Sequence, residues 1–238
     1  MKCIDVENVV IEIHDRGRNT VALVNDRYAI KLCCGDSCEG LIYEARLLSM
    51  MKGRGFVELI DCGEVGECSY LVRGFSKHTL RDYVGKLSME EILEILRDLA
   101  EALRRLHLVG YVLTDLKPEN VGYDDRTAKV LDLDAATPIY GRIRVATSSY
   151  APPEFFNEGV ALRESDVYQL ALLIHELATS KLRNPAFGEE LEETGLPELD
   201  ELLRDMTNPV PVLRPSTREV IERVNRMLSK NLDRSPRT

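Results

Sequence analysis

The chain of 238 residues contains no long uninterrupted apolar run. Its longest apolar stretch, near 167–178, is broken by Gln169, His175 and Glu176, so it is too short and too polar to cross a bilayer. The first residues also lack the apolar core of a secretory signal peptide. We therefore expect a cytoplasmic protein without a membrane partner.

Basic residues are too few to balance the acidic ones. The chain has 31 Lys and Arg against 40 Asp and Glu, which gives a net charge of -9. Such a surface does not attract a nucleic-acid backbone, so we expect no nucleic-acid partner. The chain is 44% hydrophobic and 30% charged, as in ordinary globular proteins, and its length allows one large domain or two small ones. The sequence does not indicate the oligomeric state.

Cysteine is absent after residue 68, and no two cysteines form a C-x-x-C pair or lie near a His at zinc-ligand spacing. The six cysteines are Cys3, Cys33, Cys34, Cys38, Cys62 and Cys68. Reduced, mostly buried thiols are the first expectation. A disulfide within this part of the chain is the next, because intracellular proteins of some hyperthermophiles carry disulfides. A metal site is the least expected.

Strand patterns fill about the first 75 residues, and helical patterns fill most of the rest. The predicted strands are 9–13, 20–24, 28–33, 56–62 and 68–72, and the predicted helices are 41–52, one opening at 88, 166–180 and 216–228. Ser88 and Glu91 form the capping-box pattern that opens the second helix. No internal repeat is present. The sequence therefore predicts an α+β protein.

Two carboxylates and an amide stand at fixed spacings in the middle of the chain. Asp115 begins the run D-L-K-P-E-N, Asn120 ends it, and Asp132 follows in the run D-L-D. The first carboxylate can accept a proton from an attacking hydroxyl, and the amide and second carboxylate can hold Mg²⁺ against ATP phosphates. These runs resemble the catalytic loop H-R-D-L-K-P-E-N and the D-F-G motif of eukaryotic-type protein kinases.

The resemblance extends over roughly residues 9–228 and implies a two-lobed, protein-kinase-like α+β fold. The N-lobe would be a small five-stranded antiparallel sheet with one helix, and the C-lobe would be mainly helical. The implied division of a single kinase domain over 1–238 is N-lobe 1–73, hinge 74–77, C-lobe 78–230 and frayed tail 231–238.

The same resemblance implies four catalytic residues. Asp115 would be the catalytic base, and Lys117 would neutralise charge on the γ-phosphate. Lys31 lies in Y-A-I-K, which is similar to the V-A-I-K strand of kinases, and would bind the α- and β-phosphates. Glu44 resembles the helix Glu that pairs with this Lys.

ATP and Mg²⁺, with Mn²⁺ as another possible metal, are the implied cofactors. Asn120 and Asp132 would be the metal ligands, because Mg²⁺ prefers hard oxygen donors. Gly17 would lie in the phosphate loop, and Val21 and Ala29 would pack on the adenine.

Four further residues fit structural positions of the family. Glu154, in a run similar to A-P-E, should form a buried ion pair with Arg214. Asp166 should cap the helix at 166–180 and brace the catalytic loop. Thr147 should contact the catalytic residues.

The chain departs from the family pattern at several places. The phosphate loop has Gly17 alone where kinases have three glycines, which would weaken the approach of backbone amides to phosphate. Leu113 and Thr114 replace His-Arg, so switching by loop phosphorylation is less expected. Asp134 replaces the Gly of D-F-G, which favours a fixed conformation. Arg73 lies near the back of the expected adenine pocket, where a charge has no evident physical reason.

The leading hypothesis is an ATP- and Mg-dependent kinase that phosphorylates Ser or Thr in protein substrates, because Lys117 is typical of serine/threonine kinases. One alternative is a pseudokinase that serves as a binding or scaffold module, which the single-glycine loop favours. Another is a kinase-like enzyme acting on a small molecule, which the P-P-E segment around Glu154 argues against.

Overall fold

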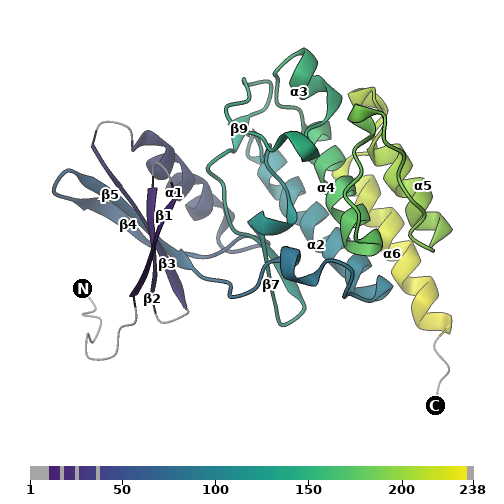
Figure 1. The fold of residues 1–238 in the computed structure, drawn as a ribbon, viewed down its shortest axis with the longest axis horizontal. Coiled ribbons are helices and arrows are strands. Elements are labelled where there is room, and N and C mark those ends of the chain that lie inside the picture. The colour runs from purple at the N-terminus through teal and green to yellow at the C-terminus, as the bar shows by residue number, and fades with distance from the viewer. Residues whose placement is uncertain (1–10, 17–18, 25–26, 36–37, 235–238) are drawn as a thin grey trace. The chain divides into compact units, whose positions relative to one another are not determined.

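The computed structural model describes residues 11–16, 19–24, 27–35 and 38–234, and the side chains of 21–24, 27–35 and 38–230 among them. The chain divides into two compact units, Met1–Lys77 and His78–Thr238. Figure 1 colours it by residue number, from purple at the N-terminus to yellow at the C-terminus. The expected hinge, 74–77, stays a prediction. Gly17 and the first two residues of the expected strand 9–13 lie outside the described residues.

A five-stranded antiparallel sheet with the strand order β1-β2-β3-β5-β4 frames the first unit. Its strands are β1 (Ile11–Arg16), β2 (Asn19–Val24), β3 (Tyr28–Cys34), β4 (Leu59–Val65) and β5 (Cys68–Gly74). Strand β4 begins three residues later than predicted. Phe56 and Val57, which made the sequence before it resemble a strand, are instead buried in the core ahead of it.

Helix α1 (Glu39–Met51) packs against β4 and β5 of this sheet. Its buried residues include Leu41, Ala45 and Leu48, which recur at helical spacing. The helix ends at Met51, one residue before the predicted end, and its C-cap residue Lys52 has a left-handed backbone (φ 50°) followed by Gly53 at φ 70°. A left-handed C-terminal cap next to a glycine explains why the helix stops there.

Two disulfides cross-link the first unit, which corrects the expectation of reduced thiols. Cys33 is bonded to Cys38, and Cys34 is bonded to Cys68. The first joins the end of β3 to the residue before α1, and the second joins β3 to β5. Cys62 is an exposed free thiol. Neighbouring residues of a strand point to opposite faces, so Cys33 and Cys34 reach different partners.

The second unit is mainly helical. Its α-helices are α2 (Met89–Leu108), α3 (Pro153–Asn157), α4 (Arg163–Thr179), α5 (Pro197–Met206) and α6 (Thr217–Arg234). Helix α2 packs against both α4 and α6 (Figure 1). It starts where predicted, because the Ser88 side chain accepts a hydrogen bond from the Glu91 amide. Helix α6 continues to Arg234, so residues 231–234 of the expected tail are helical.

Short elements connect these helices. The two-stranded sheets pair β6 (Tyr111–Val112) with β9 (Thr137–Pro138), and β7 (Val121–Asp124) with β8 (Thr127–Val130). The 3-10 helices are η1 (Leu80–Tyr83), η2 (Pro118–Asn120), η3 (Ser148–Tyr150), η4 (Pro185–Phe187) and η5 (Pro211–Leu213). Helix α4 is buried along most of its length and forms the centre of this unit. Across the described ranges, no helix has the length and apolar character that crossing a membrane requires.

Candidate active site

An ion pair between Lys31 of β3 and Glu44 of α1 lies inside the first unit. The Lys31 Nζ atom is 2.9 Å from Oε1 and 2.8 Å from Oε2 of Glu44, and the side chains are only 5% and 0% exposed. The Cys33–Cys38 disulfide links the same strand to the residue before this helix. Because an isolated buried charge is costly, each member keeps the other in place.

Val21 and Ala29 share the Lys31 face of the sheet. Val21 lies opposite Lys31 on β2, and Ala29 precedes Lys31 by two residues on β3, where side chains return to the same face. Arg73 lies opposite Ala29 on β5 and is 9% exposed. Its Nη1 donates to the Gly74 carbonyl, but its Nε has no hydrogen-bond partner within the described part of the chain.

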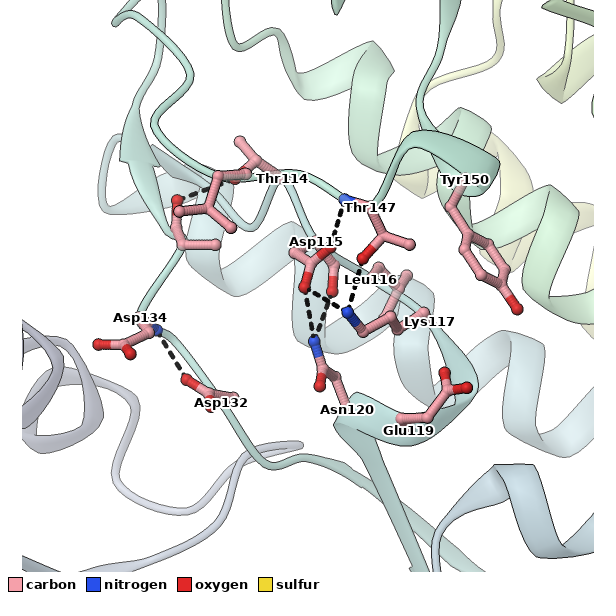
Figure 2. Close-up of polar contacts among 12 residues, drawn as sticks. Thr114, Asp115, Leu116, Lys117, Glu119, Asn120, Asp132, Asp134, Thr147 and Tyr150 are labelled. Atoms are coloured by element: carbon pink, nitrogen blue, oxygen red, sulfur yellow. Dashed lines mark hydrogen bonds and ion pairs between the residues drawn. The ribbon is translucent and has the colours of Figure 1, made fainter. Parts of the chain in front are cut away.

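A polar network surrounds the Asp115 carboxylate in the second unit (Figure 2). Asn120 Nδ2 donates to the Asp115 carbonyl (2.9 Å) and to its Oδ2 (3.0 Å). The Lys117 ammonium lies 2.9 Å from Asp115 Oδ2 and donates to Thr147 Oγ1 at 2.6 Å. The Thr147 amide donates to Asp115 Oδ1 at 2.8 Å. The expected contact of Thr147 with Asp115 and Lys117 is present.

The backbone before Asp115 is held in an unusual conformation. Thr114 has a φ of 66°, a region that β-branched residues rarely adopt and that costs about 1–3 kcal/mol. The Asp166 carboxylate accepts hydrogen bonds from the amides of Leu113 (2.9 Å) and Thr114 (3.0 Å). Gln169 Nε2 donates to the Thr114 carbonyl at 2.9 Å. These contacts with α4 hold the strained turn and so fix where the Asp115 side chain begins.

Asp166 therefore braces the catalytic loop as expected, but it does not cap α4. The helix starts earlier, after the N-cap residue Leu162, and Asp166 lies in its first turn. There its carboxylate also meets His107 Nε2 of α2 at 2.8 Å. The negative charge stays near the helix N-terminus, where the helix dipole favours it.

Asp132 follows β8 by two residues and lies in a tight turn. Strand β8 ends at Val130, and the fully buried Leu133 anchors the turn. The Asp132 Oδ1 atom accepts the Asp134 amide at 2.9 Å. Figure 2 shows this turn beside the Asp115 network.

The donor chemistry of Asn120 and Asp132 fits a hard divalent cation. Asn120 uses its amide nitrogen on Asp115, which leaves its side-chain oxygen turned away from that carboxylate. An amide oxygen and a carboxylate are ligands that suit Mg²⁺ or Mn²⁺.

Glu154 and Arg214 form the predicted ion pair. The guanidinium donates to both carboxylate oxygens, at 2.7 and 2.8 Å, and the side chains are 3% and 0% exposed. Ser165 Oγ of α4 also donates to Glu154. The pair fastens α3 to α4 and to the segment before α6.

Sequence reasoning missed several residues that support the catalytic loop. His107 and Gln169 contact Asp166 and the loop backbone from α2 and α4. Arg81 of η1 contacts Glu119, in the turn between Lys117 and Asn120. These partners lie 38 to 59 residues apart in the sequence, where no local pattern connects them.

Comparisons with known proteins agree with this geometry. A family model described as protein kinase domain matches residues 19–237. The chain is 29% identical over 167 residues to the serine/threonine-protein kinase PrkC of Bacillus subtilis, which covers 66% of this chain and 26% of that protein. It is 29% identical over 168 residues to the serine/threonine-protein kinase PknL of Mycobacterium tuberculosis, covering 66% and 42%. The mouse serine/threonine-protein kinase Nek4 is 31% identical over 208 residues, covering 75% and 26%. The chain spans less than half the length of these relatives.

Proposed function

Because the chain belongs to the protein kinase domain family, we propose that it transfers the γ-phosphoryl group of ATP to Ser or Thr hydroxyls of protein substrates. The observation that carries this proposal is the Asp115 carboxylate, oriented by Asn120 and the Thr147 amide with the Lys117 ammonium beside it. A carboxylate fixed in this way can orient an acceptor hydroxyl and receive its proton.

The proposed step forms one bond and breaks one. The acceptor oxygen bonds to the γ-phosphorus, the bond from that phosphorus to the β–γ bridging oxygen breaks, and ADP leaves. The acceptor proton moves to Asp115 Oδ. Lys117 stabilises charge on the phosphoryl oxygens through its ammonium group, and most of the catalysis is positioning and electrostatics.

The remaining predicted site residues take binding roles in this proposal. Lys31, held by Glu44, would bind the α- and β-phosphates of ATP. Asn120 and Asp132 would hold Mg²⁺ or Mn²⁺, which when bound neutralises phosphate charge. Gly17, Val21 and Ala29 would contact the nucleotide.

Radiolabel transfer from ATP to a generic protein substrate tests the proposal. We expect Asp115→Asn and Asp132→Asn each to lower the transfer rate by about 10²-fold or more, with an unchanged unfolding temperature. Asp98→Asn on α2 is the matched control, because Asp98 is a partly exposed carboxylate that pairs with its neighbour Arg97. Equal transfer by the wild type and Asp132→Asn would overturn the assignment.

Thermal unfolding with and without Mg-ATP separates the alternatives. Binding raises the stability of the native state by RT ln(1 + [L]/Kd), so a kinase should show a concentration-dependent shift. A protein that shows neither a shift nor transfer is a binding module. A protein that hydrolyses ATP and labels a small molecule but no polypeptide acts on that molecule instead.

A cytoplasmic location, where ATP is abundant, completes the proposal. It requires the two disulfides to persist inside a cell, as they do in intracellular proteins of hyperthermophiles. Rapid thiol alkylation of intact cells measures this directly. If the reagent alkylates all four of these cysteines, Cys33, Cys34, Cys38 and Cys68, the disulfides are absent inside the cell.

A further inference from the structure

One guanidinium bridges three groups at the surface of the second unit. Arg81 Nε donates to Glu119 Oε1 at 2.7 Å, and its Nη2 donates to the Tyr150 hydroxyl at 2.9 Å. Its Nη1 donates to Glu176 Oε1, while the Tyr150 hydroxyl donates to the other oxygen of Glu176. The four side chains come from η1, η2, η3 and α4.

Two carboxylates of different exposure flank this cation. The Glu176 side chain is 7% exposed, whereas the Glu119 side chain is 46% exposed. The Arg81 side chain is 36% exposed. Partial burial lowers the pKa of Arg81, but hydrogen bonds to Glu119 and Glu176 outweigh it, so the pKa is raised. Burial and the bond to Glu176 raise the pKa of Tyr150.

This cluster lies beside the reacting groups. Glu119 is in the same turn as Lys117 and Asn120, and Tyr150 ends the short helix that follows Thr147. Thr147 contacts both Asp115 and Lys117, and Figure 2 shows Glu119 and Tyr150 flanking Lys117. A polypeptide that brings a hydroxyl to Asp115 must therefore lay its neighbouring residues near this cluster.

Without Arg81, two carboxylates would face the substrate with no cation between them. A buried carboxylate such as Glu176 needs a positive partner, and an Arg or Lys of a substrate could supply it. With Arg81 in place that position is filled, and a second cation would meet a like charge. Repulsion of this kind would exclude substrates that carry an Arg or Lys at this position.

We propose that Arg81 is a specificity-determining residue that occupies, from within the chain, an acidic site where a basic substrate residue would bind. The proposal rests on the proposed phosphorylation of protein substrates. It assigns Arg81 two effects, since the residue also holds the turn at Glu119 and the helix at Tyr150. The first effect selects against substrates with Arg or Lys near the acceptor, and the second positions the loop.

A set of matched peptides tests it. One fluorescent peptide has a Ser acceptor among Ala residues, and six others carry a single Arg at one of the three positions on either side. Affinity is measured by fluorescence anisotropy, and kcat/KM by phosphate transfer. In the wild type no Arg peptide should exceed the Ala peptide. In the Arg81→Ala variant, the affinity and kcat/KM of at least one Arg peptide should rise about tenfold relative to those of the Ala peptide. Adding Glu119→Gln should reduce that rise.

Arg97→Ala is the matched control, because Arg97 of α2 has the same 36% side-chain exposure and pairs with its neighbour Asp98. It should leave every ratio unchanged. If Arg81→Ala does not fold, Arg81→Lys replaces it, since an ammonium cannot satisfy three acceptors in the geometry of a guanidinium. A smaller gain, about threefold, is then expected.

An equal loss of kcat for all peptides, with unchanged Arg-to-Ala ratios in the folded variants, would make Arg81 a purely structural residue and overturn the inference. If the proposed function itself is wrong, the wild type will transfer phosphate to none of the peptides. The anisotropy ratios still decide the role of Arg81 in that case.

Discussion

At the scale of single residues, the Glu154–Arg214 pair should matter more than any surface pair. Arg214→Ala leaves a buried carboxylate without its partner, so we expect a loss of about 3–5 kcal/mol in the free energy of unfolding. Urea denaturation followed by circular dichroism measures it.

Arg218→Ala is the control for this prediction. Arg218 also pairs with a glutamate, Glu222, but its side chain is 82% exposed. Exposed pairs contribute about 0–1 kcal/mol, so this variant should be nearly as stable as the wild type. Similar losses in both variants would mean that burial does not set the strength of the pair.

Residues within a short run could be predicted from sequence, whereas residues that act across the fold could not. The run from Asp115 to Asn120 places three interacting groups within six positions, and the structure brings them together. Lys31 and Glu44 lie only 13 residues apart on a strand and the next helix. Arg81 has no such pattern, because Glu176 lies 95 residues further on.

At the scale of elements, the N-terminus of α2 should make the stability pH-dependent. The Ser88 side chain and amide donate to Glu91, which lowers the pKa of that carboxyl below 4.5. A lowered folded pKa means that this stabilisation is complete above pH 4.5 and is lost as the pH falls toward the folded value. Glu91→Gln should flatten this part of the pH–stability curve, measured by thermal unfolding between pH 3 and 7.

Glu90→Gln is its matched control, since the exposed Glu90 lies in the same first turn outside the capping box. Its pH dependence should follow the wild type. A Glu91→Gln curve that also follows the wild type would show that the capping box contributes no pH-dependent stability.

Helix ends were predictable where they carry chemical signals, whereas α3 and α5 were missed and α4 starts three residues before its predicted start. Ser88 and Gly53 mark ends of α2 and α1 through capping geometry. Strand β4 was misplaced because the buried residues Phe56 and Val57 look like strand residues although they pack as an irregular segment. Local propensity does not distinguish these cases, since tertiary packing decides both.

At the scale of the whole molecule, the covalent cross-links are confined to one unit. Chain entropy predicts about 4 kcal/mol from Cys34–Cys68 and about 2 kcal/mol from Cys33–Cys38, whose sequence separations are 34 and 5. Replacing each cysteine pair with serines should weaken hydrogen-exchange protection in β3 and β5. The weakening should be larger for Cys34–Cys68 than for Cys33–Cys38. Protection in α2 should not change. Equal weakening in both units would show that they unfold together.

The bonds that Asp166 accepts have a consequence for how the protein is made. The carboxylate ties α4 to Leu113 and Thr114, which are 53 and 52 residues earlier in the chain. A ribosome delivers those residues first, so the strained turn before Asp115 emerges without the group that holds it. A half-synthesised chain therefore already carries the Asp115 carboxylate, but the backbone before it gains the hydrogen bonds to Asp166 only after α4 has left the exit tunnel and docked.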